Sequence, residues 1–223
     1  MSKVVKLQAS DGHELDAYVA QPEGKPRAGL VVVQEIFGVN KHIRSVADRF
    51  AREGFYAVAP ALFDRVERNV DWGYDGESMK KGMAIVQKIG IDNALKDVDA
   101  ALQFASKETG KAAGVVGFCY GGTLAWLSAT RLAPAAVVGY YGGNIASFAQ
   151  ENPRVPVMLH FGKKDDHIPA TDVAKVQTAH PEVEIYWYDA GHGFNCDMRG
   201  SYNEKAAKEA MGRTLEFFNK HLQ

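Results

Sequence analysis

The pattern of apolar and polar positions changes in character along the chain. Residues 14–20 alternate with a period of two, and together with residues 4–7 and the turn at 10–12 they predict an antiparallel hairpin with one covered face. Residues 29–33 form an unbroken apolar run rich in valine, which is typical of a strand buried on both faces. The sequence therefore predicts an antiparallel edge that leads into a parallel sheet.

Strands and helices alternate over the rest of the chain. Further strands are predicted at 55–60, 114–118, 136–141, 155–161 and 183–188. Helices are predicted at 41–53, 78–89, 92–107, 123–129, 170–179 and 203–221. This order indicates an α/β fold with a mostly parallel central sheet and helices on both faces. No linker divides the chain, so we expect one domain over residues 1–223.

The segment 61–77 breaks this regular order. It shows no periodicity, and its aromatic and glycine residues, among them Trp72, are typical of a loop that covers a binding pocket. We therefore expect a lid in this part of the chain.

Composition narrows the classes of partner. The net charge is −1 and no basic block is present, so the sequence indicates a small-molecule ligand rather than nucleic acid or an anionic membrane. Two cysteines cannot build a disulfide framework, which fits a reducing compartment. No apolar run approaches the roughly 18 residues of a membrane span, and the first residues lack a signal core. We expect a soluble, cytoplasmic protein.

A glycine-rich turn at 117–122 carries the strongest chemical signal. The order Gly-Phe-Cys-Tyr-Gly has the form of a nucleophile elbow, where a strand turns at once into a helix, with sulfur in place of the usual hydroxyl. At such a turn Cys119 stands above the sheet, and the helix N-terminus with the Tyr120 N–H favours an anion beside it. The alternative is a buried, inert cysteine.

Ligands of parallel sheets bind beyond the carboxyl ends of the strands. The polar residues that follow predicted strands most closely are Glu35, Cys119, Asp165 and His192. His192, between two glycines, can be a base toward a nucleophile and then an acid toward a leaving group; otherwise it is a surface histidine. Asp165 can orient the imidazole; otherwise it is a capping or solvated carboxylate, and Asp166 competes for the same role.

The chain resembles the dienelactone hydrolase family of the α/β-hydrolase superfamily. The resemblance covers nearly the whole chain and rests on the order of nucleophile, acid and histidine and on the segments 34–38, 117–122, 138–142, 162–169 and 188–194. It implies an α/β-hydrolase fold and a carboxymethylenebutenolidase-like enzyme. Such an enzyme opens enol-lactones such as dienelactone, or cleaves related small activated esters, through an acyl-enzyme and without a cofactor or metal. The resemblance also implies a monomer.

The same resemblance assigns a role to each residue of the site. Cys119 would be the nucleophile, His192 the base and Asp165 its partner. The backbone amides of Ile36 and Tyr120 would form the oxyanion hole.

Glu35 would, by the resemblance, hold or deprotonate the thiol until substrate displaces it. A carboxylate beside a thiol also disfavours the thiolate through like-charge repulsion, which would protect Cys119 from oxidation. The alternative is an ion pair between Glu35 and a nearby arginine such as Arg44.

The position that should bind a substrate carboxylate departs from the family. Members that act on dienelactone hold its carboxylate with basic residues, one of them four positions after the catalytic histidine, where this chain has Cys196. Arg199 can substitute from the same loop, and two lysines lie near the second basic position, for which Met79 competes. The predicted substrate-binding residues are Phe37, Arg199, Lys80, Lys81 and Trp72.

Cys196 leaves further interpretations open. With Cys119 and His192 it suggests zinc, but the close pairs C-x-x-C and H-x-x-x-H are absent, so no metal is expected. As a resolving thiol it would make the protein a redox sensor. His160, within a predicted strand, is expected to be a core histidine with a satisfied ring. The competing functions are a broad-specificity carboxylesterase or thioesterase and a non-catalytic relative that binds a small molecule.

Overall fold

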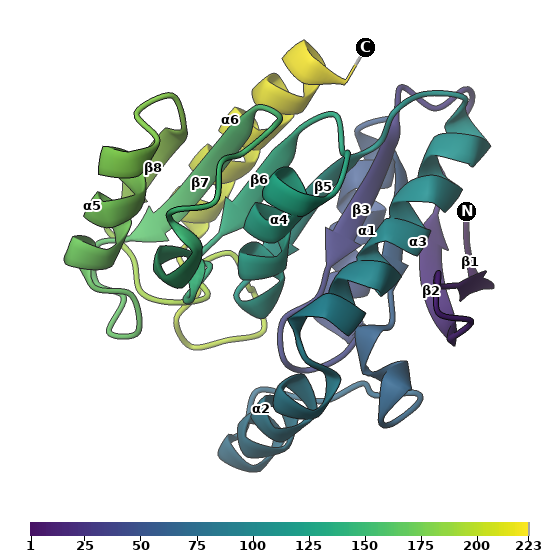
Figure 1. Ribbon diagram of the computed structural model, residues 1–223, viewed down its shortest axis with the longest axis horizontal. Helices are drawn as coiled ribbons and strands as arrows, with labels where there is room; N and C mark the ends of the chain where they lie inside the picture. The colour runs from purple at the N-terminus through teal and green to yellow at the C-terminus, as the bar shows by residue number, and fades with distance from the viewer. Residues whose placement is uncertain (223) are drawn as a thin grey trace.

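The computed structural model describes residues 1–222 and contains an eight-stranded sheet at its centre (Figure 1). The strand order is β1-β2-β4-β3-β5-β6-β7-β8; β1, β2 and β4 pair antiparallel, and all later neighbours pair parallel. The predicted hairpin and mostly parallel sheet are thereby confirmed. The strands are β1 (Ser2–Gln8), β2 (Glu14–Ala20), β3 (Gly29–Val33), β4 (Tyr56–Pro60), β5 (Gly114–Phe118), β6 (Val137–Tyr140), β7 (Val157–Gly162) and β8 (Glu184–Tyr188).

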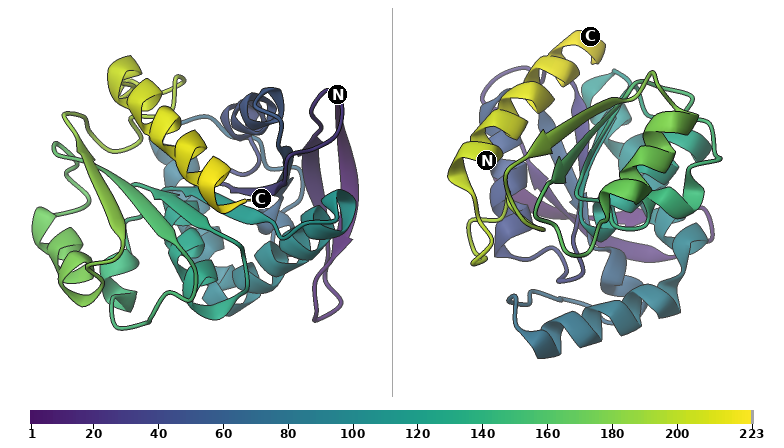
Figure 2. Two further views of the ribbon diagram at one scale, coloured as in Figure 1. Left: turned by 90° about the horizontal axis from the view of Figure 1, so that it is seen from above. Right: turned by 90° about the vertical axis from the view of Figure 1, so that its left-hand side faces the viewer.

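Helices cover both faces of this sheet (Figure 2). One face carries α1 (Lys41–Arg52) and α6 (Glu204–His221), and the other carries α3 (Ile91–Thr109), α4 (Tyr120–Arg131) and α5 (Ala170–Ala179). A further helix, α2 (Gly76–Ile89), lies beyond the carboxyl ends of the parallel strands (Figure 1). Short 3-10 helices occupy Leu62–Arg65 and Ile145–Phe148. The predicted α/β fold class is confirmed.

The sheet centre and α4 form the core because their sequences are apolar on every side. All residues of β3, β4 and β5 are buried, and so is every residue from Gly121 to Thr130 in α4. No helix within residues 1–222 combines the length and apolar character that a bilayer crossing demands.

His160 of β7 lies inside this core. Its Nδ1 is 2.9 Å from the Tyr188 hydroxyl and its Nε2 is 3.0 Å from Thr214 Oγ1, so both ring nitrogens have partners. Burial, with a smaller contribution from Arg213, lowers the pKa of His160 to about 3, and the ring is neutral. The prediction of a core histidine with a satisfied ring is confirmed.

The segment 61–77 differs from the expected lid. Leu62 and Phe63 are buried in the core, because a loop with two adjacent large apolar side chains is stabilised by packing them inward. Trp72 packs against the Phe63 ring at 6.3 Å between centroids, and its carbonyl oxygen accepts a hydrogen bond from Asn40. The helix α2 that follows, and not this segment, forms the outer wall of the cavity beside Cys119 described below.

Gly117 permits the close passage of β5 and α4. A Cβ atom at this position would overlap the carbonyl oxygen of Gly121. We therefore expect Gly117→Ala to lower the free energy of unfolding by about 1–3 kcal/mol, the usual cost of overpacking.

Gly212→Ala is the matched control, because Gly212 is exposed in α6 and a Cβ atom there meets nothing within 4 Å. Alanine favours a helix interior over glycine by about 1 kcal/mol, so this variant should be stabilised. Urea unfolding of both variants makes the comparison. Equal stabilities would show that the two backbones do not press on each other at Gly117.

Candidate active site

Cys119 occupies the sharp turn between β5 and α4. Its backbone has φ 54° and ψ −115°, a conformation that a non-glycine residue adopts only when its surroundings enforce it. The enforcement comes from both sides, since its N–H donates to the Tyr140 carbonyl at 3.0 Å and its own carbonyl accepts from Gly122 at 2.9 Å. The side chain of Cys119 faces the cavity at the carboxyl ends of the strands.

His192 and Asp165 meet on the loops that follow β8 and β7. Nδ1 of His192 lies 2.8 Å from Oδ2 of Asp165, whose side chain is buried. The other oxygen of Asp165 accepts the N–H of His167 at 2.8 Å, which fixes the carboxylate plane. Asp166, the competing candidate, is exposed. The structure therefore brings Asp165, and not Asp166, to the imidazole.

The environment of His192 favours its protonated form. Burial alone lowers the pKa of His192, but hydrogen bonds to Asp165 and Cys119 outweigh it and raise the pKa to about 10. With Nδ1 directed at Asp165, Nε2 is the nitrogen left for the thiol of Cys119. The imidazole thus carries a proton at neutral pH, with the Asp165 carboxylate on one side and the Cys119 sulfur in the same cavity.

This shift predicts a pH-dependent contribution of His192 to stability. The folded state holds the proton more tightly than an unfolded histidine with its pKa near 6.5. The stabilisation is therefore complete below about pH 6.5 and is lost as the pH rises to about 10, at up to about 1.4 kcal/mol per pH unit. Urea unfolding of wild type and His192→Gln should show a larger difference at pH 6 than at pH 10. A difference independent of pH would contradict the raised pKa.

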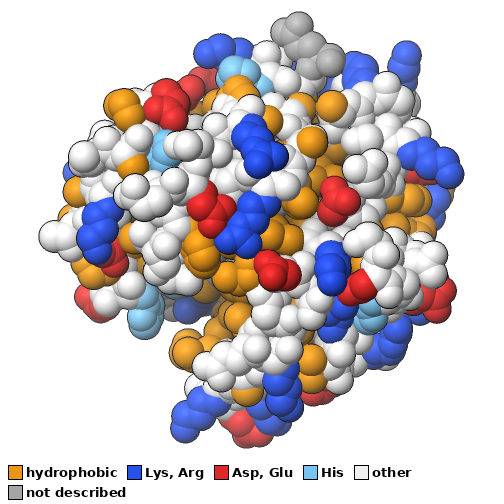
Figure 3. Space-filling model, viewed as in Figure 1, with side chains coloured by type: hydrophobic (Ala, Val, Ile, Leu, Met, Phe, Trp, Pro, Cys, Tyr) orange, Lys and Arg blue, Asp and Glu red, His pale blue; other side chains and the backbone are white. Residues whose placement is uncertain are grey.

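The cavity beside Cys119 has a volume of about 380 Å³ and is mostly apolar. Figure 3 shows hydrophobic side chains exposed in the hollow beside α2. Ile36 and Tyr120 also line it, and within residues 1–222 the backbone N–H of neither residue has a hydrogen-bond acceptor. Both amides are therefore available to an oxygen atom bound near Cys119. The apolar side chains of the wall are Phe37, Met79, Met83, Val86, Ile91 and Leu124.

The predicted substrate-binding residues separate into two groups. Phe37 and Arg199 line the cavity. Lys80 and Lys81 lie on the exposed side of α2, where Lys81 pairs with Glu77, and Met79 takes the inward position. Trp72 is not among the lining residues either, since it packs against the core.

Glu35 is buried and engaged with two partners. The Tyr74 hydroxyl donates to Glu35 Oε2 at 2.8 Å, and the Arg199 guanidinium lies 3.5 Å from Oε1. Arg44, the arginine considered from the sequence, pairs instead with Asp71 at 2.8 Å. The carboxylate is therefore held by one strong hydrogen bond and one long ionic contact.

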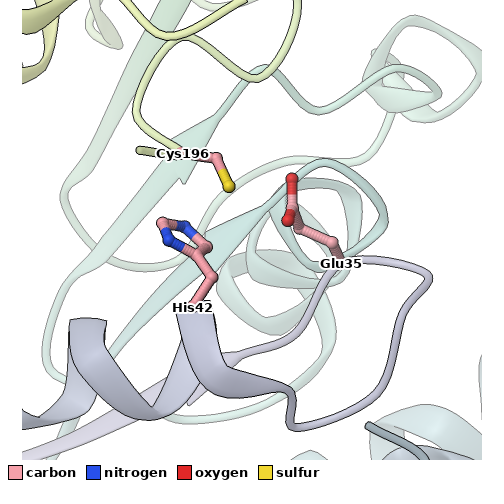
Figure 4. A group of neighbouring side chains, drawn as sticks. All are labelled: Glu35, His42 and Cys196. Carbon is pink, nitrogen blue, oxygen red and sulfur yellow. The ribbon is translucent and has the colours of Figure 1, made fainter. Parts of the chain in front are cut away.

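A second group of titratable side chains surrounds Glu35. One ligand atom each of Glu35, His42 and Cys196 lies within 4.8 Å of the others, and all three residues are buried (Figure 4). We call these three residues the Glu35 cluster. Burial lowers the pKa of His42, whereas burial and the nearby Glu35 raise the pKa of Cys196 to about 11, so both are neutral at pH 7.

Sequence reasoning missed two polar members of this region. His42 lies on the buried face of α1 beside Ile43, and a polar residue in that position was the available signal. Tyr74 reaches Glu35 from a segment without periodicity, and no local pattern marks that contact.

The chain is similar to known proteins over nearly its whole length. The family model described as "Dienelactone hydrolase family" matches residues 15–222. A carboxymethylenebutenolidase of Pseudomonas putida is 30% identical over 97% of this chain and 96% of its own length. A Synechocystis protein provisionally named carboxymethylenebutenolidase is 31% identical, over 94% and 93%. The crystal structure of a Klebsiella pneumoniae protein, provisionally named dienelactone hydrolase, is 31% identical with a TM-score of 0.84 over 99% of each chain.

Proposed function

The chain belongs to the dienelactone hydrolase family and is an ester-hydrolysing enzyme; we propose that it opens enol-lactones such as dienelactone, or cleaves related small activated esters, through Cys119. The observation that carries the proposal is the row of three side chains at the cavity floor. Cys119 and His192 line the same cavity, Cys119 is among the groups that raise the pKa of His192, and His192 Nδ1 lies 2.8 Å from Asp165. Such a row activates a nucleophile and supplies a proton to the leaving group.

In the proposed reaction His192 holds the proton of the Cys119 thiol, and the sulfur attacks the carbonyl carbon of the substrate. The carbonyl oxygen becomes an oxyanion, which the N–H groups of Ile36 and Tyr120 bind. The tetrahedral intermediate collapses, the C–O bond to the leaving group breaks, and His192 donates its proton to the departing oxygen. Water then attacks the thioester with His192 as base; the C–S bond breaks, the acid is released, and the sulfur of Cys119 is restored beside the protonated His192.

The raised pKa of His192 supports its role as the proton donor. With a pKa of about 10 the ring is protonated at neutral pH, so the proton is in place when the C–O bond breaks. Asp165 stabilises the imidazolium and fixes the ring so that Nε2 faces the sulfur. An enol or aryl leaving group needs little more assistance than this single proton.

Glu35 is proposed to regulate the nucleophile from the back of the site. Tyr74 and Arg199 hold its carboxylate in the resting state. A substrate carboxylate that binds Arg199 would release Glu35 Oε1 from its long ionic contact. The freed Glu35 carboxylate then acts on the thiol of Cys119 in one of two ways, depending on the distance between them. It accepts the thiol proton, or it keeps the thiol protonated through like-charge repulsion of the thiolate.

The proposal is tested with two substrates, an activated aryl ester and cis-dienelactone. Purified protein is mixed with each, product release is followed, and intact and peptide mass spectra are recorded after rapid acid quenching. We expect turnover of at least one substrate together with an acyl mass on the peptide that contains Cys119. When hydrolysis of the acyl-enzyme is the slow step, the adduct accumulates. Turnover without the adduct under that condition would show that another residue is the nucleophile.

Arg199 is expected to select substrates with a carboxylate. Arg199→Gln should raise KM for cis-dienelactone by about tenfold or more, the effect of losing a charge-assisted hydrogen bond of about 1.5–3 kcal/mol, and should change KM for a neutral aryl ester much less. Lys80→Gln is the matched control, since it removes a cation from exposed α2 outside the cavity. If Arg199→Gln raised KM equally for both substrates, Arg199 would only hold Glu35 and would not bind a substrate carboxylate.

A broad-specificity carboxylesterase is the second candidate, and the cavity wall favours it. Among residues 1–222, the cavity lining contains one arginine, Arg199, and no lysine. The side chains that α2 contributes to the wall are apolar. An open hollow of about 800 Å³ shares Val86, Ile91 and Tyr120 with the cavity and gives space to a larger leaving group. A rate for long-chain aryl esters above that for dienelactone would favour this function.

A further inference from the structure

The Glu35 cluster combines a carboxylate, an imidazole and a thiol, which are the three side-chain types that bind zinc. The three side chains come from different parts of the chain, the turn after β3, the start of α1 and the loop after β8, and they point toward one another in Figure 4. We propose that a divalent, thiophilic cation such as Zn²⁺ binds at the Glu35 cluster. This inference goes beyond the proposed hydrolysis, which uses no metal.

The spacing of the cluster is close to that of a tetrahedral site. Bonds of about 2.0–2.3 Å to a tetrahedral zinc place neighbouring ligand atoms about 3.3–3.8 Å apart. The atoms of the cluster lie within 4.8 Å of one another, so rotations that move each by roughly 1 Å close the site. Three protein ligands leave the fourth position to a water molecule, as at catalytic zinc sites.

Groups that orient metal ligands are already present around the cluster. The Tyr74 hydroxyl holds Glu35 Oε2 at 2.8 Å and leaves Oε1 with a long contact. The Asp197 carboxylate lies 3.3 Å from Nδ1 of His42, while Nε2 is buried without a hydrogen-bond partner within residues 1–222. A carboxylate on one ring nitrogen is the usual support for a histidine whose other nitrogen binds a metal.

Charge balance also allows the cation. Glu35 is buried, and its positive partner is Arg199 at 3.5 Å, a distance at the limit of a hydrogen bond. A cation on Oε1 replaces this guanidinium, which also lines the cavity. On binding, the Cys196 thiol loses its proton to solvent, and no oxidation or reduction takes place. Because the cation holds Glu35, we expect it to inhibit hydrolysis reversibly.

The catalytic pair is the competing site, since Cys119 and His192 also offer sulfur and nitrogen to a metal. Two matched serine variants separate the possibilities, because Cys119→Ser leaves only the cluster thiol and Cys196→Ser leaves only the catalytic thiol. Each variant of the full chain is titrated anaerobically with Co²⁺, and the thiolate-to-cobalt charge-transfer band is recorded. Zn²⁺ is then added to displace the cobalt.

We expect the charge-transfer band, with one equivalent of cobalt, in wild type and in Cys119→Ser, and its loss in Cys196→Ser. Glu35→Gln should weaken the affinity for cobalt at least tenfold while the band persists at saturation, which tests the cluster even where Cys196→Ser folds poorly. No band in wild type, or a band kept in Cys196→Ser and lost in Cys119→Ser, overturns the proposal. These spectra do not depend on catalysis, so failure of the metal site and failure of the proposed hydrolysis are distinguishable.

Discussion

Replacement of Cys119 by alanine is expected to reduce kcat/KM for an activated ester by about 10⁴-fold or more, because no other group replaces the attacking atom. The sulfur is placed by the strained backbone of the elbow, and Ile36 and Tyr120 line the same cavity. A residual rate above that of water is compatible with the proposed mechanism, since substrate binding and the amides proposed to bind the oxyanion survive the substitution. Initial rates with an aryl ester and with dienelactone measure the effect.

A serine at position 119 tests whether activity requires sulfur itself or only a nucleophilic atom at this turn. Cys119→Ser keeps a nucleophilic atom at the turn, but serine needs a base to remove its proton, and at neutral pH His192 already carries one. We expect activity between those of wild type and Cys119→Ala. Near-UV circular dichroism of all three proteins controls for the fold. Wild-type turnover in folded Cys119→Ala would reject Cys119 as the nucleophile.

The sheet and its helices could be predicted because their patterns are local. The run at 29–33 is apolar throughout because β3 is buried on both faces, and 14–20 alternates because β2 lies in the antiparallel edge of the sheet. The predicted helix 170–179 coincides with α5. The elbow was also readable, since glycine at 117 and 121 is required where two backbones pass closely.

Contacts between distant segments could not be predicted from local sequence patterns. Lys80 and Lys81 lie near the expected basic position in the sequence, but the rotation of α2 directs Met79 inward and leaves the lysines exposed. The partner of Glu35 is Arg199, 164 residues away, rather than the nearby Arg44. Such pairings depend on how loops from several strands meet at one edge of the sheet, which no local period encodes.

Asp165→Asn is expected to lower kcat by about 10³- to 10⁴-fold while the fold stays intact. The amide keeps the size of the carboxylate and can still meet Nδ1 of His192 and the N–H of His167. It cannot stabilise an imidazolium, and where its NH₂ faces Nδ1 it selects the tautomer with a proton on Nε2. Asp166→Asn is the matched control, because Asp166 is adjacent and exposed, and it should retain wild-type rates.

The pH dependence of Asp165→Asn distinguishes an electrostatic role from a structural one. Hydrogen bonding to Asp165 and Cys119 raises the pKa of His192 to about 10, so loss of the carboxylate must lower that pKa. A chemical-shift titration of His192 should show this decrease in Asp165→Asn and no change in Asp166→Asn. If kcat falls but the pKa of His192 stays near 10, Asp165 acts only by holding the loop in place. If both fall together, the carboxylate keeps the proton on His192 that the leaving group receives.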